Sequence, residues 1–481
     1  MKKPNILLIM TDTHRCDALG CMGGHGVSPN IDRLAAEGAM FAQAHTPSPV
    51  CLSARTSLMT GLHAPTHGCV ENGVGIVTNA PMLSDLLREQ GYYNVMVGKT
   101  HFGRPPSSFD YALVDGSDEY ETAYAKHLRD NGYSYETDFP NVPEELFADS
   151  FLVDKTIAAL NERDASRPFF AFCSLPSPHS PVTPPGRWAK LFEERELPPL
   201  NHTPGEEENY LPHMQRLVGR ASEEERTLHT PDLVRYINSH AGVDENGREA
   251  IDALRRLYYG FAAYCDDQIG RLINYIDTAG LKDDTLVIFT TDHGQEYFDH
   301  GFNNKHVFYD ASWRIPLVLR FPGVIPARER RGFASLTDVA ATILEAAKIP
   351  QNHVQGFDLI SPLKNGTEAR SCVPGAIYFS LALATEDWKI IHHTQEGDGQ
   401  LFNRKADPAE QNNLYNKPEY ETVRDKLLIA LLKWRAGLTD VHHMQTTLKH
   451  SGPVIRRLKP HIMGLKGTDT ESALCSHSPL L

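Results

Sequence analysis

Four short apolar runs in the chain each lead into polar residues that can bind an anion or a metal ion. The runs cover 5–10, 94–97, 168–172 and 286–289, and they lead into Asp12, into Lys99 and His101, into His179, and into Asp292 and His293. Uninterrupted apolar runs of this length are typical of strands buried on both faces, as in a parallel sheet between helices. In such sheets the chemistry gathers at the carboxyl ends of the strands. The pattern therefore predicts one site that is assembled from distant parts of the sequence.

Helical spacing alternates with these runs up to about residue 370. We expect short helices over 29–38 and 82–91 and a long helix over 250–278. A further strand is expected over 315–319, where an internal proline places the segment at a sheet edge or at a strand start. Residues 1–370 are therefore predicted to form one α/β domain, in which helices sandwich a large mixed, mostly parallel sheet.

The rest of the chain divides into an insertion, a small unit and a tail. Residues 185–247 are rich in Glu, Pro, His and Asn, and their weak periodicity predicts a long insertion over the surface. Residues 371–438 are predicted to form a small C-terminal α+β subdomain, with strands over 377–381 and 388–391 followed by an amphipathic helix. The tail over 439–481 is basic and apolar in patches, and it could wrap a neighbouring subunit.

Composition and charge narrow the classes of protein to which the chain can belong. The 481 residues carry a net charge of −14 without a basic stripe, which argues against nucleic acid as a partner. No stretch reaches the roughly 18 apolar residues of a membrane span. The apolar N-terminal stretch of about six residues is shorter than the roughly 7–15 of a secretory signal. Eight scattered cysteines are mostly expected to be reduced, buried thiols. We expect a cytoplasmic protein without membrane contact.

The sharpest local motif is residues 51–61, Cys-Leu-Ser-Ala-Arg-Thr-Ser-Leu-Met-Thr-Gly. Helical spacing begins near Ser53 after an extended approach, and Gly61 provides the stop. Cys51 is therefore predicted to lie at a helix N-terminus, where unpaired N–H groups and the helix dipole favour a thiolate, an oxyanion or a bound sulfate. Arg55 lies one turn further on and can point back to the same place. Taken alone, the motif fits a buried cysteine beside a surface arginine equally well.

This motif resembles the activation signature of the type I sulfatases, which belong to the alkaline-phosphatase superfamily. In that family a cysteine is oxidised after translation to formylglycine, and the hydrated aldehyde acts as the nucleophile. The positions that match the signature are Cys51, Ala54, Arg55, Thr60 and Gly61. Two positions depart from it, because Leu52 is larger than usual and Ser53 stands where proline is the norm.

Other segments resemble motifs of the same family in the same order. They are the first strand and metal loop over 5–20, the Gly-Lys-x-His segment over 97–103, the Pro-His-x-Pro loop over 177–181, the Asp-His-Gly region over 291–306, and the C-terminal signature over 401–414. Asp292 followed by His293 resembles the branch with Asp-His where other members have Asp-Asn. The resemblance spans nearly all of residues 4–437 and implies an alkaline-phosphatase-like fold.

A divalent cation is the cofactor that these residues predict. Carboxylate oxygens favour Ca²⁺ or Mg²⁺, and a histidine nitrogen makes Mn²⁺ an alternative. The family resemblance favours Ca²⁺, and its cation would act as a Lewis acid and a template. The expected metal ligands are Asp12, Thr13, Cys51, Asp292 and His293.

The resemblance also implies roles for the other side chains. Residue 51 attacks sulfur as an aldehyde hydrate while Asp292 helps to remove its proton, and His179 or Lys305 gives a proton to the leaving oxygen. His101 then takes the proton of the second hydroxyl, which releases sulfate. The predicted catalytic residues are Cys51, Arg55, Lys99, His101, His179 and Lys305. Each of these side chains alone is also compatible with a structural role, such as a solvated lysine or a hydrogen-bonded histidine.

Three functions remain after these observations. The leading hypothesis is a sulfatase, a sulfuric ester hydrolase that cleaves a sulfate ester, including esters on carbohydrates, after a maturation enzyme has converted Cys51. The second is a phosphonate monoester or phosphodiester hydrolase of the same superfamily. The third is a catalytically silent binding protein. Ser53 is the reason for this alternative, because it replaces the proline that maturation enzymes read, and without maturation residue 51 remains a thiol. Whether the chain forms a homo-oligomer is left open.

Overall fold

The larger of two sheets in this computed structural model has eight strands in the order β4-β3-β5-β1-β6-β7-β2-β8. The structure describes residues 3–438, except 77, 106, 139–140, 216 and 219–244. The strands are β1 (Asn5–Thr11), β2 (Ala39–His45), β3 (Tyr93–Gly98), β4 (Tyr111–Val114), β5 (Phe169–Ser174), β6 (Thr285–Thr291), β7 (Leu317–Arg320) and β8 (Glu329–Ser335). Only β7 runs antiparallel to its neighbours, β6 and β2. The predicted mixed, mostly parallel sheet is therefore confirmed.

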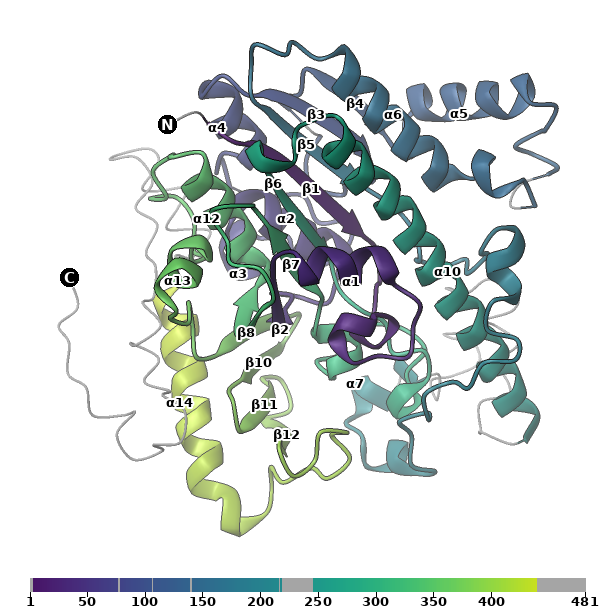
Figure 1. The fold of residues 1–481 in the computed structure, drawn as a ribbon. Helices are drawn as coiled ribbons and strands as arrows, with labels where there is room; N and C mark the ends of the chain where they lie inside the picture. Colours follow the sequence, from purple (N-terminus) through teal and green to yellow (C-terminus); the bar gives the residue numbers. More distant parts are fainter. Residues whose placement is uncertain are drawn as a thin grey trace.

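Helices cover both faces of this sheet, because successive residues of the central strand enter two different cores. In β1, Ile6, Leu8 and Met10 pack into one apolar cluster, whereas Leu7 and Ile9 pack into the other. The first cluster includes side chains of α2 (Cys51–Thr60), α4 (Leu83–Glu89), α12 (Leu336–Ala346) and α13 (Ile360–Asn365). The second includes side chains of α1 (Pro29–Ala36), α5 (Asp118–Asp130), α6 (Ala148–Glu162) and α10 (Glu245–Thr278). Figure 1 shows the long helix α10, in teal, lying across its face of the sheet.

The smaller sheet is a four-stranded antiparallel meander in the order β12-β11-β10-β9. Its strands are β9 (Val373–Ile377), β10 (Ser380–Ala384), β11 (Trp388–His393) and β12 (Asp398–Asn403). The final helix α14 (Glu421–Gly437) packs Leu427, Leu431 and Trp434 against Leu383 and Ile390 of this sheet. Figure 1 shows α14, in yellow, beside the small sheet. Whether 1–370 and 371–438 fold as separate units stays a prediction.

One detail of the expected elements is wrong, and two others are made more exact. Residues 377–381 do not form one strand, because β9 ends at Ile377, β10 begins at Ser380 and the two pair as a tight hairpin. Of the two alternatives for the 315–319 segment, the strand start is confirmed, because β7 begins at Leu317, and the sheet edge is excluded, because β7 lies between β6 and β2. Its proline precedes the strand, so the missing N–H does not interrupt the hydrogen-bond ladder. Helix α2 begins at Cys51, two residues before the expected start.

The described part of the predicted insertion contains short helical turns, of which α7 (Pro212–Gln215) is one. Phe192 from this part packs on Tyr259 of α10, with ring centroids 5.5 Å apart. Residues 219–244 of the insertion and the tail over 439–481 lie outside the described residues. As predicted, Cys16, Cys51, Cys69, Cys173, Cys265 and Cys372 are buried thiols. In the described part of the chain, no helix is both long and apolar enough to cross a membrane.

Candidate active site

Two of the predicted metal ligands, Asp12 and Asp292, leave the large sheet side by side at its carboxyl edge. Asp12 directly follows β1 and Asp292 directly follows β6, and these strands pair in parallel with Thr11 opposite Thr291. Lys99 follows β3, two strands away from β1 in the same sheet. Asp12 and Asp292 are 280 positions apart in the sequence, and they lie close together because each follows the carboxyl end of one of two neighbouring parallel strands. The apolar runs predicted this arrangement.

Cys51 occupies the first position of α2 and is buried. Its Sγ lies 3.1 Å from Nε2 of His293 and 3.2 Å from Nζ of Lys305. Burial and the nearby Asp12 would raise the pKa of the thiol, but the positive charges of Lys305, His293 and Lys99 outweigh them and hold this pKa well below its ordinary value. The position is therefore built to carry negative charge.

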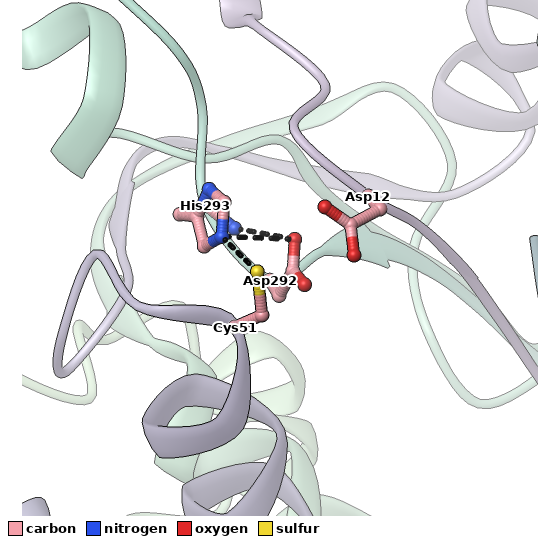
Figure 2. A group of neighbouring side chains, drawn as sticks. All are labelled: Asp12, Cys51, Asp292 and His293. Carbon is pink, nitrogen blue, oxygen red and sulfur yellow. Dashed lines mark hydrogen bonds and ion pairs between the residues drawn. The ribbon is translucent and has the colours of Figure 1, made fainter. Parts of the chain in front are cut away.

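Donor atoms of Asp12, Cys51, Asp292 and His293 all lie within 4.8 Å of one another. Figure 2 shows the sulfur of Cys51 at the helix tip, facing the His293 ring and the two carboxylates. The Oδ1 atom of Asp12 is buried without a hydrogen-bond partner. The Nδ1 atom of His293 lies 2.8 Å from the carbonyl oxygen of Gly294 and donates to it, so Nε2 faces the group. In the protonated ring Nε2 donates to Cys51 Sγ, and in the neutral ring its lone pair would be available to a cation. An unpartnered carboxylate oxygen, a second carboxylate and an imidazole lone pair fit a divalent cation.

Arg55 holds the two carboxylates together. Its Nε donates to Asp292 Oδ2 at 2.7 Å, and its Nη2 donates to Asp12 Oδ2 at 3.1 Å. Its Nη1 donates to the Ser174 hydroxyl at 2.7 Å and to the Lys99 carbonyl at 3.1 Å. The guanidinium is thus fully engaged beneath the site, so its positive charge acts on the carboxylates first and on the position of Cys51 from behind.

Two lysines and a histidine complete the positive side of the site. Lys99 Nζ donates to Asp12 Oδ2 at 2.5 Å. Lys305 Nζ donates to Cys51 Sγ and, at 3.1 Å, to Nε2 of His179. Burial alone would raise the pKa of Asp12, but Lys99, His179, Arg55 and Lys305 together hold it well below its ordinary value. The carboxylate of Asp12 therefore stays charged although it is buried.

Two predicted residues lie further from the reacting position. The structure shows no hydrogen bond between the His101 ring and Cys51; instead, His101 lines a cavity of about 590 Å³ together with Lys99 and His179. Thr13 adjoins the metal ligands through its backbone, since its N–H donates to Asp292 Oδ1 at 3.2 Å. Its backbone is left-handed, with φ of 60°, which points to a constrained loop at the site. The roles given to both residues stay predictions.

Several residues that support the site were not among those predicted. Ser174 accepts from Arg55, and Asp149 accepts a hydrogen bond of 2.5 Å from the Ser177 hydroxyl. The backbone N–H of Asp12 in turn donates to the Ser177 carbonyl. The sequence signal for these contacts was the presence of Ser174 and Ser177 just after the apolar run at 168–172. Serine is too common at strand ends for this signal to identify a site residue.

Glu296 is the clearest titratable residue outside the predicted set. It is fully buried three residues beyond His293, and burial raises its pKa to about 8. Arg15 lies nearby, but it donates to the Glu296 carbonyl and pairs with the carboxylates of Asp17 and Asp299. The Glu296 carboxyl therefore lacks a dedicated positive partner and favours its neutral form.

We expect stability to fall with rising pH because of Glu296. Its folded pKa of about 8 lies above its ordinary pKa, so the folded state holds the proton longer than the unfolded chain. The stability that the folded state gains by keeping Glu296 protonated is fully present below about pH 4 and is lost as the pH rises toward about 8. Glu296→Gln keeps the neutral form, and its stability relative to the parent should increase by about 2–4 kcal/mol between pH 4.5 and pH 8. Thermal unfolding of both proteins across this range measures the difference; a difference that is constant with pH would contradict it.

Comparison with known proteins gives a family for this arrangement. The profile of the sulfatase family matches residues 4–349, and a profile described as N-sulphoglucosamine sulphohydrolase, C-terminal, matches residues 298–437. An arylsulfatase of Clostridium perfringens is 28% identical, with 93% of this chain and 99% of the relative covered. An N-acetylglucosamine-6-O-sulfatase of Bacteroides thetaiotaomicron is 26% identical, with coverage of 89% and 85%. The crystal structure of a phosphonate monoester hydrolase of Agrobacterium radiobacter superposes with a TM-score of 0.80 at 25% identity, covering 95% of this chain and 100% of that chain.

The sulfatase profile covers the whole large sheet and extends beyond Lys305. Its span of well over half the chain therefore includes all the segments that bring the buried carboxylates, Cys51 and the lysines together. The chain is a member of the sulfatase family, within the alkaline-phosphatase superfamily, and it is a hydrolase of that family.

Proposed function

We propose that this protein hydrolyses a sulfate ester through residue 51, converted from cysteine to formylglycine, with a divalent cation held beside it. The observation that carries the proposal is the position of Cys51 Sγ, at a helix N-terminus, 3.2 Å from the Lys305 ammonium and within 4.8 Å of the Asp12, Asp292 and His293 donors. The sulfur marks the place where the hydrate oxygen of the matured residue would lie. Sulfated sugars are the substrates that the N-acetylglucosamine-6-O-sulfatase relative suggests.

The residues present fit the cation that the family implies. Asp12, Asp292 and His293 would hold it, with residue 51 and Thr13 next to them, and it would supply positive charge to the sulfuryl oxygens. The unpartnered Oδ1 of Asp12 is the best support, because a buried carboxylate oxygen is normally hydrogen-bonded or bound to an ion. Oxygen ligands make Ca²⁺ the first candidate.

Lys305 is the proton donor that the hydrogen bonds favour. His179 Nδ1 lies 2.7 Å from the Ser180 carbonyl oxygen and must donate to it, so its Nε2 accepts from the Lys305 ammonium. In the Lys305–His179 pair the proton next to Cys51 Sγ therefore resides on Lys305, and His179 fixes the direction of the ammonium. In the proposed reaction Lys305 protonates the leaving oxygen, and His179 keeps it in place. His101 is proposed to assist the release of sulfate from the wall of the adjoining cavity.

Hydrolysis of a phosphonate monoester is the second candidate. The TM-score of 0.80 with a phosphonate monoester hydrolase supports it, as does the Asp292–His293 pair. The two activities separate on matched substrates, since an aryl sulfate and an aryl phosphonate monoester share a leaving group. A larger kcat/KM for the sulfate supports the proposed function, whereas dominance of phosphonate turnover would replace it with this second candidate.

Mass spectrometry of the peptide that contains Cys51 tests maturation. The full chain is produced with and without a co-expressed formylglycine-generating enzyme. We expect the aldehyde form only after co-expression, with turnover in proportion to its fraction. A thiol that persists after co-expression, together with no turnover of either ester, would favour a binding protein and would trace the failure to Ser53. Ser53→Pro, which restores the usual residue, is the matched variant, and it should increase conversion.

Removal of divalent cations is expected to abolish activity and to lower the Tm. Without a cation, the buried carboxylates of Asp12 and Asp292 lose a ligand that binds only the folded state, and a cation at 100 times its Kd contributes about 2.7 kcal/mol of stability. Dialysis against a chelator, followed by calorimetry and activity assays, measures both effects. Addition of Ca²⁺, Mg²⁺ or Mn²⁺ in separate samples identifies the ion. Unchanged Tm and activity after complete removal would argue against a cation at this site.

A further inference from the structure

The tip of the β9–β10 hairpin departs from ordinary turn chemistry. Tyr378 and Phe379 form a two-residue loop between the paired residues Ile377 and Ser380. Tyr378 adopts a φ of 45°, at a loop position where glycine or asparagine is usual. Phe379 is 57% exposed and Tyr378 is 44% exposed. Strain and exposed aromatic surface at one point are features that natural sequences retain where function requires them.

The two aromatic side chains line a cavity of about 320 Å³. Apolar residues from three separate segments contribute to its wall, among them Met214, Leu217 and Ile391. The His306 ring stacks on the Tyr378 ring, with centroids 6.0 Å apart and an angle of 25° between the planes. The wall of the cavity therefore combines flat aromatic side chains with aliphatic side chains.

The chain connects this cavity directly to the reacting position. His306 lines the cavity, and its neighbour Lys305 donates to Cys51 Sγ. His306 has a left-handed backbone, with φ of 83°, which separates the directions of the two adjacent side chains. A group bonded to the oxygen that Lys305 protonates would thus lie next to His306, which forms part of the wall of this cavity.

The charges along the cavity restrict what it can hold. Among the described residues that line it there is no lysine or arginine. Its carboxylate, Glu396, lies 2.8 Å from Nδ1 of His213, so this charge already has a partner. Three histidines also line the cavity, but burial lowers the pKa of His306 and of His393 to about 4, and His213 is the partner of Glu396. The wall therefore offers apolar surface and neutral hydrogen-bonding groups and no unpaired positive charge for a second anion.

We propose that this cavity binds the leaving group of the substrate, and that this group is an uncharged alcohol with one flat apolar face, such as an aryl ring or a single sugar ring. Tyr378 and Phe379 are the residues that determine this specificity, through stacking on the ring. The inference rests on the proposed function for the identity of the leaving group. It excludes substrates in which the leaving group carries further sulfate or carboxylate groups on the ring that enters the cavity.

Equilibrium binding to the unconverted Cys51 protein tests this inference without relying on turnover. Dissociation constants are measured by titration calorimetry for phenyl sulfate, for 6-sulfated N-acetylglucosamine and for inorganic sulfate. Tyr378→Gly removes the ring and also relieves the backbone strain, so the variant is expected to fold, and its Tm relative to the parent checks this. Phe379→Ala removes the second ring. Leu432→Ala is the control, because Leu432 is an apolar residue on α14 that is 67% exposed.

The hairpin variants should raise the Kd of one or both ring-bearing sulfates about 2- to 10-fold. They should leave the Kd of inorganic sulfate unchanged, and the Leu432 control should change none of the three. The ligand with the larger shift shows whether the ring is aryl or sugar. An unchanged Kd for both ring-bearing ligands would overturn the proposal and would place the ring in the cavity beside Lys99 and His179. Tighter binding of 4-carboxyphenyl sulfate than of phenyl sulfate would overturn the requirement for an uncharged ring.

This experiment separates failure of the inference from failure of the proposed function. If sulfate esters are hydrolysed but the hairpin variants bind them normally, only the inference fails. If no sulfate ester is hydrolysed after conversion of Cys51, the proposed function fails, and the binding data still decide whether the cavity accepts a ring.

Discussion

Replacing Cys51 by alanine is expected to lower kcat by about 10⁴-fold or more, because loss of a covalent nucleophile removes the whole reaction path and not one contact. Cys51→Ser should be equally inactive, since serine cannot become the aldehyde on which sulfate release depends. The buried contacts between Arg55 and the carboxylates remain in both variants, so the Tm should change little. Steady-state kinetics on an aryl sulfate, with the protein co-expressed with a maturation enzyme, gives the measurement.

Cys69→Ala is the matched control for this prediction. Cys69 is also fully buried, but burial raises its pKa to about 11, and no lysine or histidine offsets that effect as Lys305 and His293 do for Cys51. This variant should keep its activity. Activity of Cys51→Ala within tenfold of the parent would mean that another group attacks the ester. The proposed role of residue 51 would then be wrong, although the membership of the family would stand.

The sequence located the strands that build the site, because in this fold the pattern of burial is simple. The runs at 5–10, 94–97, 168–172 and 286–289 correspond to β1, β3, β5 and β6 within a few residues. Each strand is covered by helices on both faces, so it stays apolar until it leaves the sheet. The first polar residues after it are then the ones that reach the site. Local pattern and tertiary position therefore agree for Asp12, Lys99 and Asp292.

Details that depend on pairing between distant segments could not be predicted. Helical spacing let Arg55 point back to the tip of α2, but the structure pairs it with carboxylates from β1 and β6. The apolar segment 377–381 resembled one strand because its turn contains Tyr378 and Phe379 in place of glycine or asparagine. For Arg55 the structure adds partners that local spacing did not give. At the turn the local rule failed, and the side chains of that turn line a cavity.

Replacing Arg55 by methionine should destabilise the protein by about 3–5 kcal/mol when divalent cations are absent. Arg55, Asp12 and Asp292 have fully buried side chains, so water cannot solvate the two carboxylates after the guanidinium is removed. Turnover should also be lost, because the carboxylates would no longer be held in one arrangement. Calorimetric unfolding in the presence of a chelator, relative to the parent under the same conditions, measures the effect on stability.

Arg320→Met is the control variant. It separates the destabilisation caused by leaving buried carboxylates unpaired from the destabilisation caused by losing an arginine. Arg320 is fully buried and also pairs with two carboxylates, but those of Glu37 and Asp277 are 29% and 18% exposed. Water can solvate them in the variant, so we expect a smaller loss of stability, and activity should remain because the pair lies outside the site. Added Ca²⁺ should stabilise the parent and both variants, since all three keep Asp12 and Asp292. It should reduce the loss of stability relative to the parent only in Arg55→Met, where the cation replaces the missing positive charge beside these two carboxylates. Equal losses in the two variants, with no response to Ca²⁺, would show that Arg55 is an ordinary structural arginine and that Asp12 and Asp292 do not bind a cation.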